Sequence, residues 1–415
     1  MHSSKRQGLS LASIFLTFFI DNLSWSIVFP LFAPYFLESQ VHVFSADVSL
    51  QTRTTILGFF LMAFSLGQFL GAPVIGEYAD RNGRRKALLM SVFFTCFGFA
   101  LTAWSMERDN LYLLFLGRLI TGIFASNMSI CLACVTDLSP DEKQKAKRFG
   151  YLSFLAGLSF ILGAFVGGKI SDPTISPLFT FTFPLWVATF FSLINFLFIL
   201  FGFRETSPIN SEVQFDFLEC FRNLKEALQT EQIKRIYAIY FLFLFAWTML
   251  FQFVPVLVVT KFDFTNSTIG DLALFMGICW AIGSGYLNKI LVKRFLPLRV
   301  LEVSLILFTI LCAVIIFPKH LYGTLGVLAG CVVLGGLAWP LCTSFISNVA
   351  PRNIQGKVLG ISQSVQSLAM ALAPALGGVV YQGYTGFPFL LGAFASLIAA
   401  GLYFTLKDHK KMGGE

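Results

Sequence analysis

The chain has 415 residues, of which 56% are hydrophobic and 13% are charged, and its mean hydropathy is +0.75. Soluble domains carry about 25% charged residues, so this composition excludes an ordinary soluble protein and indicates a polytopic membrane protein. The net charge of +8 could suggest a nucleic-acid partner. The basic residues lie in short loops between apolar segments, however, so we expect a lipid bilayer as the partner and no nucleic acid.

Twelve apolar segments are long enough to cross a bilayer as helices, which requires about 20 residues each. The first six cover residues 9–36, 55–76, 87–105, 111–135, 149–170 and 178–203. The second six cover residues 236–259, 267–291, 300–317, 322–347, 358–381 and 387–406. We therefore predict an all-α membrane protein with 12 transmembrane helices. The first segment begins too late and is too long for a cleavable signal peptide.

The polar stretch 204–235 divides the chain into two predicted six-helix halves, residues 1–203 and 236–415. Within this linker, residues 217–227 have apolar side chains at helical spacing and predict a short helix on the membrane surface. A shift of 210 residues places Gly163–Gly168 over Ala373–Gly378. This internal repeat supports the division into two related halves.

The lysines and arginines are distributed unevenly between alternate loops. With both termini in the cytoplasm, most basic residues fall in cytoplasmic segments, as the positive-inside rule requires. The predicted outside loops contain only Arg53, Arg108, Lys169, Lys261 and Lys319. Arg118 alone is left at membrane depth. We therefore predict that both termini are cytoplasmic.

The loop between the second and third spans carries a glycine, an acid–base pair, a second glycine and two arginines at fixed spacing. These residues are Gly76, Asp80, Arg81, Gly83, Arg84 and Arg85. Gly83 can adopt a positive φ in a short turn, and Gly76 would allow another helix to approach closely. Taken without its spacing, the loop is an ordinary positive-inside loop.

The complete pattern G-x-x-x-D-R-x-G-R-R resembles the signature loop of the major facilitator superfamily. The resemblance implies two six-helix halves related as parallel repeats, a substrate cavity between them and alternating access. It also implies that the loop braces the halves in one state, with Asp80 meeting the positive end of a helix in the second half.

Asp21 lies in the first span, ahead of Pro30 and Pro34, which should bend the helix. Burial penalises the ionised form of a carboxyl group, so Asp21 is suited to bind and release a proton. This span resembles the first helix of the drug/proton antiporters, which include the tetracycline exporters. The alternative is a structural acid that bonds a neighbouring helix.

Arg118 begins the pattern R-x-x-x-G in the fourth span, which ends at Gly122 and has Thr121 where glutamine is usual. The pattern resembles a superfamily motif whose arginine is linked to proton coupling. A buried arginine needs an anionic partner, for which Asp21 is the candidate. We therefore assign proton coupling to Asp21 and Arg118, with a snorkelling arginine as the alternative.

The fifth span is glycine-rich and resembles a motif that marks exporters of the superfamily. Ala164 replaces the usual proline, although the repeat in the eleventh span keeps it. The residues of the two copies are Gly157, Gly163, Gly167, Gly168, Pro374, Gly377 and Gly378. Small residues at helical spacing also allow close helix packing without any role in export.

Polar and aromatic residues at membrane depth are candidates for a substrate cavity. They are Asn22, Gln68, Asn127, Trp247, Gln252, Trp280, Trp339 and Gln363. Because 16% of the chain is aromatic, a cluster of this kind is also expected by chance.

The sequence contains no phosphate-binding loop and no catalytic constellation, and Cys131-x-x-Cys134 has neither a second pair nor nearby histidines. We therefore expect a transporter with no metal and no cofactor, not an enzyme. The prediction is proton-coupled efflux of small amphipathic, drug-like molecules by a monomer in a bacterial inner membrane. One alternative is proton-coupled import or export of a metabolite such as an amino acid, nucleoside or siderophore. Another is a receptor or assembly factor built on a transporter scaffold.

Overall fold

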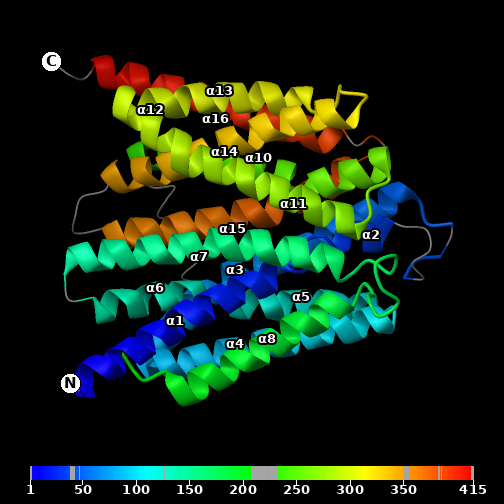
Figure 1. Cartoon of the computed structure of the whole chain (residues 1–415). Helices are drawn as coiled ribbons and strands as arrows, with labels where there is room; N and C mark the ends of the chain where they lie inside the picture. The colour runs from blue at the N-terminus through cyan, green and yellow to red at the C-terminus, as the bar shows by residue number, and fades with distance from the viewer. Residues whose placement is uncertain are drawn as a thin grey trace. The chain divides into compact units, whose positions relative to one another are not determined.

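A computed structural model describes residues 2–37, 43–45, 47–125, 127–139, 141–206, 222, 231–349, 355–381, 384 and 386–412. Regular structure in these residues is entirely helical (Figure 1). Among these described residues, 11 helices are long and apolar enough to cross a membrane, and Leu11–Ser26 is a shorter apolar helix. The all-α membrane fold is therefore confirmed. The proposed surface helix at 217–227 lies outside the described residues, apart from residue 222.

The first predicted span is broken where the prolines lie. Helix α1 (His2–Ser26) ends in a turn, after which α2 (Phe32–Leu37) continues. The backbone N–H of Phe29 bonds to Ser26 and that of Leu31 bonds to Val28, both over three residues. Pro30 has no N–H to donate, so the α-helical ladder cannot run through it. The predicted bend is confirmed.

Two compact units make up the fold, and they interleave in sequence. The first contains Met1–Ala46, Ala63–Glu219 and Phe264–Leu274; the second contains Asp47–Met62, Cys220–Asp263 and Phe275–Glu415. Helix α3 (Leu50–Asn82) and helix α11 (Asn266–Ala281) each contribute to both units.

In the first unit, α1 and α4 each pack against several other helices. The partners of α1 are α6 (Asn127–Leu138), α7 (Glu142–Lys169) and α8 (Phe183–Gly202). Helix α4 (Arg84–Glu107) packs against α5 (Leu111–Phe124), α6 and α8. Buried apolar side chains from α1, α3, α4, α6, α7 and α8 form one continuous core, which fixes the polar groups described below.

In the second unit, α10 (Glu231–Phe262) is central. In its apolar 18-residue stretch, 78% of the residues are buried. It packs against α14 (Leu321–Val349), α15 (Gln355–Val380) and α16 (Phe387–Met412). Helix α13 (Pro297–Val314) packs against α14 and α16.

The eighth predicted span changes its winding along its length. Helix α11 passes into a π-helix, η1 (Ile282–Leu287), and then into α12 (Asn288–Arg294). π-Helical turns are rare and often mark functional sites. The sequence analysis did not predict this feature.

Candidate transport site

Asp21 lies on α1, where the side chains of α6 and α8 converge on its carboxyl group. The Asn195 amide donates a hydrogen bond to Asp21 Oδ1 over 2.9 Å, and the Asn127 side chain lies beside the same group. Both asparagines are buried. Asp21 Oδ2 and the side-chain oxygens of both asparagines have no hydrogen-bond partner among the described residues. Three buried acceptors therefore face a shortage of donors, which a proton on the carboxyl group would reduce.

Arg118 lies on α5 and is also buried. Its guanidinium carbon is 4.9 Å from the Phe32 ring centroid and 4.7 Å from that of Phe64. Aromatic faces stabilise a desolvated cation. The expected ion pair with Asp21 is not formed among the described contacts, because asparagines hold that carboxyl group instead. The two proposed coupling residues thus have separate surroundings.

The signature loop joins α3 to α4 through a network of charges. Arg84 forms ion pairs with Asp80 at 2.6 Å and with Asp137 on α6 at 3.5 Å. Arg85 donates to the Leu200 carbonyl over 2.6 Å. Arg81 is exposed at the end of α3. The loop residues therefore connect α3, α4, α6 and α8 within the first unit.

Gly83 has φ of +95°, as its predicted turn requires. The turn exposes the first N–H groups of α4, and Glu205 accepts from Arg84 N at 2.8 Å and Arg85 N at 3.1 Å. A carboxylate at a helix N-terminus also interacts favourably with the positive end of the helix dipole. Glu205 lies more than a hundred residues from this loop in the sequence, so the local pattern does not indicate it as a capping residue. Its position directly after the sixth span is the only sequence signal for this role.

The glycine motif is used for packing at most of its predicted positions. Gly163 and Gly167 lie against α1, where an added Cβ would collide with Ser26 and Ile27. Gly377 lies against Phe253 and Met249 of α10 in the second unit. Gly168 and Gly378 contact other glycines, and Pro374 presents its carbonyl to Gly58.

At two glycines the packing prediction is wrong for this conformation. A Cβ on Gly76 or Gly157 would meet no atom within 4 Å. Gly157 lies on an exposed part of α7, where no neighbouring backbone approaches. Gly76 lies on α3, where it faces open space, so close helix approach does not explain either residue.

The predicted cavity residues fall in both units. Asn22 donates to the Phe18 carbonyl of its own helix over 2.7 Å, and Gln68 is half-buried on α3. In the second unit, the Trp247 and Trp280 ring centroids are 4.8 Å apart, and those of Trp280 and Trp339 are 5.8 Å apart.

Three tryptophans from α10, α11 and α14 thus form one aromatic cluster. Gln252 is half-buried on α10, whereas Gln363 is exposed on α15. The structure therefore brings the tryptophans together but does not gather the predicted glutamines with them.

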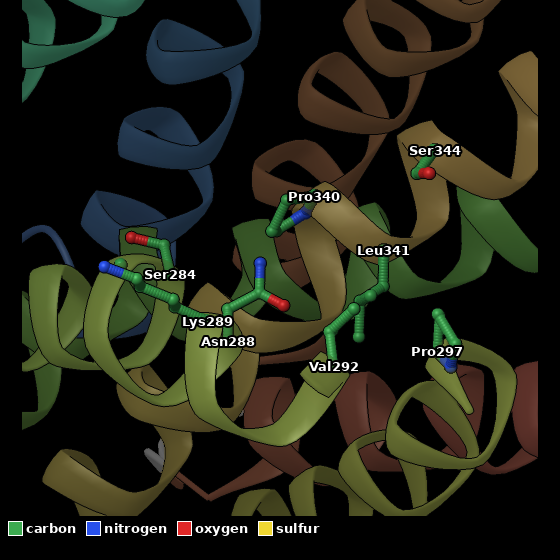
Figure 2. A pocket seen from close by; sticks show the side chains of 9 residues that line it. Ser284, Asn288, Lys289, Val292, Pro297, Pro340, Leu341 and Ser344 are labelled. Atoms are coloured by element: carbon green, nitrogen blue, oxygen red, sulfur yellow. The ribbon is translucent and has the colours of Figure 1, made fainter. Parts of the chain in front are cut away.

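The second unit also contains a pocket of about 380 Å³ that the sequence did not indicate (Figure 2). One wall is formed by η1 and α12, and the other by α14 and the start of α13. The lining residues are Ser284, Gly285, Asn288, Lys289, Val292, Pro297, Pro340, Leu341 and Ser344. Within the described part of the chain, no group of His, Cys, Asp or Glu side chains could hold a metal ion.

The fold and these sites define a multi-pass helical membrane protein whose polar groups are buried between spanning helices. The sequence model of the Major Facilitator Superfamily matches residues 14–336 and 289–414. The chain belongs to this superfamily and is a transporter protein rather than an enzyme.

Similar proteins include drug resistance proteins and an organic anion transporter. The class H tetracycline resistance protein of Pasteurella multocida is 23% identical, with 97% of this chain and 96% of that protein covered. Multidrug resistance protein 2 of Bacillus subtilis is 26% identical, with 85% and 87% covered. The structure of the human organic anion transporter MFSD10 matches with a TM-score of 0.70 at 20% identity, covering 96% of this chain and 99% of that one. The last similarity shows the fold alone.

Proposed function

We propose that this transporter exports small amphipathic molecules in exchange for protons by alternating access. The observation that carries the proposal is the carboxyl group of Asp21, whose Oδ2 atom is buried and which lies between two asparagines on separate helices. An intramembrane carboxyl group is costly unless it is protonated or paired, so one that exchanges protons suits a coupling role. Similarity to tetracycline and multidrug resistance proteins supports the export direction.

Arg118 has a second role in this proposal. Its fixed positive charge opposes protonation of groups nearby and can attract an anionic group when its aromatic contacts change. The signature loop then sets the balance between inward-facing and outward-facing conformations. Its Arg84–Asp80–Asp137 network joins α3, α4 and α6, the Arg85–Leu200 bond adds α8, and Glu205 caps α4. The protein acts as a monomer in a bacterial inner membrane, with both termini in the cytoplasm.

The test uses purified protein in proteoliposomes that are acidic inside and contain a pH-sensitive dye. A cationic drug such as ethidium, added outside, should cause protons to leave the vesicles. Asp21→Asn should abolish this exchange, whereas Asn22→Ala, a matched change in a side chain that bonds its own helix, should retain it. Exchange that is unchanged in Asp21→Asn would contradict the assignment.

A second candidate is a metabolite transporter that moves an amino acid, nucleoside or siderophore together with a proton. Ala164 favours it, because the exporter motif usually has proline at this position. The same vesicles distinguish the two functions when a neutral outside solution is replaced by an acidic one. Proton entry that depends on an added metabolite would establish import and exclude the drug-export proposal.

A further inference from the structure

The pocket in the second unit exists because two helices cross closely and then diverge. At the crossing, a Cβ on Gly283 would collide with Val333, and one on Gly336 would lie 3.0 Å from the Trp280 carbonyl. Beyond the crossing, η1 winds with π-helical geometry and α14 contains Pro340, which interrupts its hydrogen-bond ladder. Both irregularities border the pocket, with Gly285 on one wall and Pro340 on the other.

The polar groups that line this pocket are suited to an anion. Lys289 supplies a positive charge and Ser344 adds a hydroxyl group, whereas the Ser284 hydroxyl already donates to a backbone carbonyl. Figure 2 shows the Asn288 amide directed from α12 toward Pro340 across the pocket. None of the nine lining residues is acidic. The buried Asn288 side-chain oxygen has no hydrogen-bond partner among the described residues, so it can accept from a hydroxyl or N–H of a ligand.

None of the nine lining residues is a tryptophan, although two of them follow tryptophans of the aromatic cluster in sequence. Trp280 precedes Ser284 by one helical turn, and Ser284 donates to the Trp280 carbonyl over 2.8 Å. Trp339 is adjacent in sequence to Pro340. The apolar part of the lining consists of Val292, Pro297, Pro340 and Leu341, so an apolar body next to the anionic group would contact these side chains.

We propose that this pocket binds the anionic group of an amphipathic organic anion, whose apolar body contacts Val292, Pro297, Pro340 and Leu341. Lys289 pairs with a carboxylate or phosphate. On a ligand that also carries a hydroxyl or N–H group, the Asn288 oxygen accepts a hydrogen bond from that group. The anion comes either from a transported solute or from an anionic lipid headgroup. The solute source rests on the proposed function; the binding chemistry does not.

Binding is tested with the full-length protein in nanodiscs by calorimetric titration of three probes that share one ring system. These probes are 1-naphthoate, the neutral 1-naphthalenemethanol and the cationic 1-naphthylmethylamine. We expect 1-naphthoate to bind most tightly and Lys289→Met to weaken it about tenfold, the loss expected for one charge-assisted hydrogen bond. Lys293→Met is the matched control, because Lys293 lies one turn further along α12 and does not line the pocket.

The lipid composition of the nanodisc separates the two sources. If phosphatidylglycerol competes with 1-naphthoate in the wild type but not in Lys289→Met, the occupant is a lipid headgroup. If phosphatidylglycerol has no effect and 1-naphthoate is moved into proteoliposomes, the occupant is a solute. Equal affinity for the three probes, or equal losses in Lys289→Met and Lys293→Met, would overturn the proposal. Binding that persists without any proton-coupled transport would overturn only the proposed function.

Discussion

Two glycine contacts, one in each unit, occupy related places in the internal repeat. In the first unit, Gly168 of α7 lies against Gly270 of α11; in the second, Gly378 of α15 lies against Gly58 of α3. Gly168 and Gly378 are separated by the 210-residue shift that relates the two halves of the sequence. Each contact pairs a helix from one predicted half with a helix from the other.

The polar groups around these two contacts differ. Next to Gly168, Lys169 donates to Ser267 and forms an ion pair with Asp271, each at 2.8 Å. Next to Gly378, the polar contact is a hydrogen bond of 3.0 Å from Thr55 to the Gly378 carbonyl. The repeat therefore preserves close backbone approach at both contacts, with an ion pair beside Gly168 and a neutral hydrogen bond at Gly378. Packing at both sites is governed by the absence of a side chain.

The largest expected effect comes from adding a side chain at either contact. A Cβ on Gly168 would lie 2.5 Å from the Asn266 carbonyl oxygen, and one on Gly378 would lie 2.8 Å from that of Thr54. Because backbone cannot move aside easily, Gly168→Val and Gly378→Val should each cost about 1–3 kcal/mol of stability in this conformation. Thermal unfolding of the purified protein in detergent measures the loss.

Gly157→Val is the control, because its side chain would enter open space. It should change stability by less than about 0.5 kcal/mol. If all three variants behave alike, close packing does not distinguish the two contacts from the rest of the glycine motif.

The ion pair should have a smaller effect, and only in the first unit. Its side chains are partly exposed, at 32% for Lys169 and 50% for Asp271. Lys169→Met and Asp271→Asn should therefore each cost about 0.5–1 kcal/mol, and the double variant should cost less than their sum. Unfolding at low and high salt tests this, because salt should weaken the wild type more than the double variant. Full additivity would show that the pair contributes no coupling.

At the second contact, Thr55→Val removes the hydroxyl group while it keeps the side-chain shape. The Thr55 hydroxyl also contacts the Gln51 carbonyl of its own helix, at 2.9 Å. Since the bond is neutral and shared, we expect a loss of about 0.5 kcal/mol that is independent of salt. Thermal unfolding at two salt concentrations checks both points. A loss larger than that of Lys169→Met would reverse the ranking of the two contacts.

The smallest effect should be present at neutral pH and disappear at acid pH. Burial alone would raise the pKa of Asp172, but hydrogen bonds from Thr174 and Thr265 and the charge of Lys169 lower it below its ordinary value. Asp172 therefore stabilises the fold above the ordinary aspartate pKa, and this contribution is lost as pH falls through the lower folded value. Comparing Asp172→Asn with wild type by unfolding from neutral to acid pH should show a difference that shrinks on acidification. A constant difference would contradict it.

The helical fold could be predicted from the sequence because each membrane span is a continuous run of apolar residues. The break near Pro30 could be predicted because proline has no backbone N–H to donate to the helix. Gly163 and Gly167 were also predictable as packing residues. Glu205 and Asn195 were not, because their roles depend on partners far along the chain. The anion pocket depends on a π-helix and a proline in different spans, so no local pattern indicates Lys289 as a lining residue.

Substrate exchange without net proton movement tests the central claim most directly. Proteoliposomes containing wild-type protein or Asp21→Asn are loaded with unlabelled drug, and entry of labelled drug is followed with and without a proton gradient. A neutral side chain at Asp21 mimics the protonated carboxyl group, so we predict that drug–drug exchange persists while gradient-driven accumulation disappears. Accumulation that responds to the gradient equally in both proteins would contradict the assignment of proton coupling to Asp21.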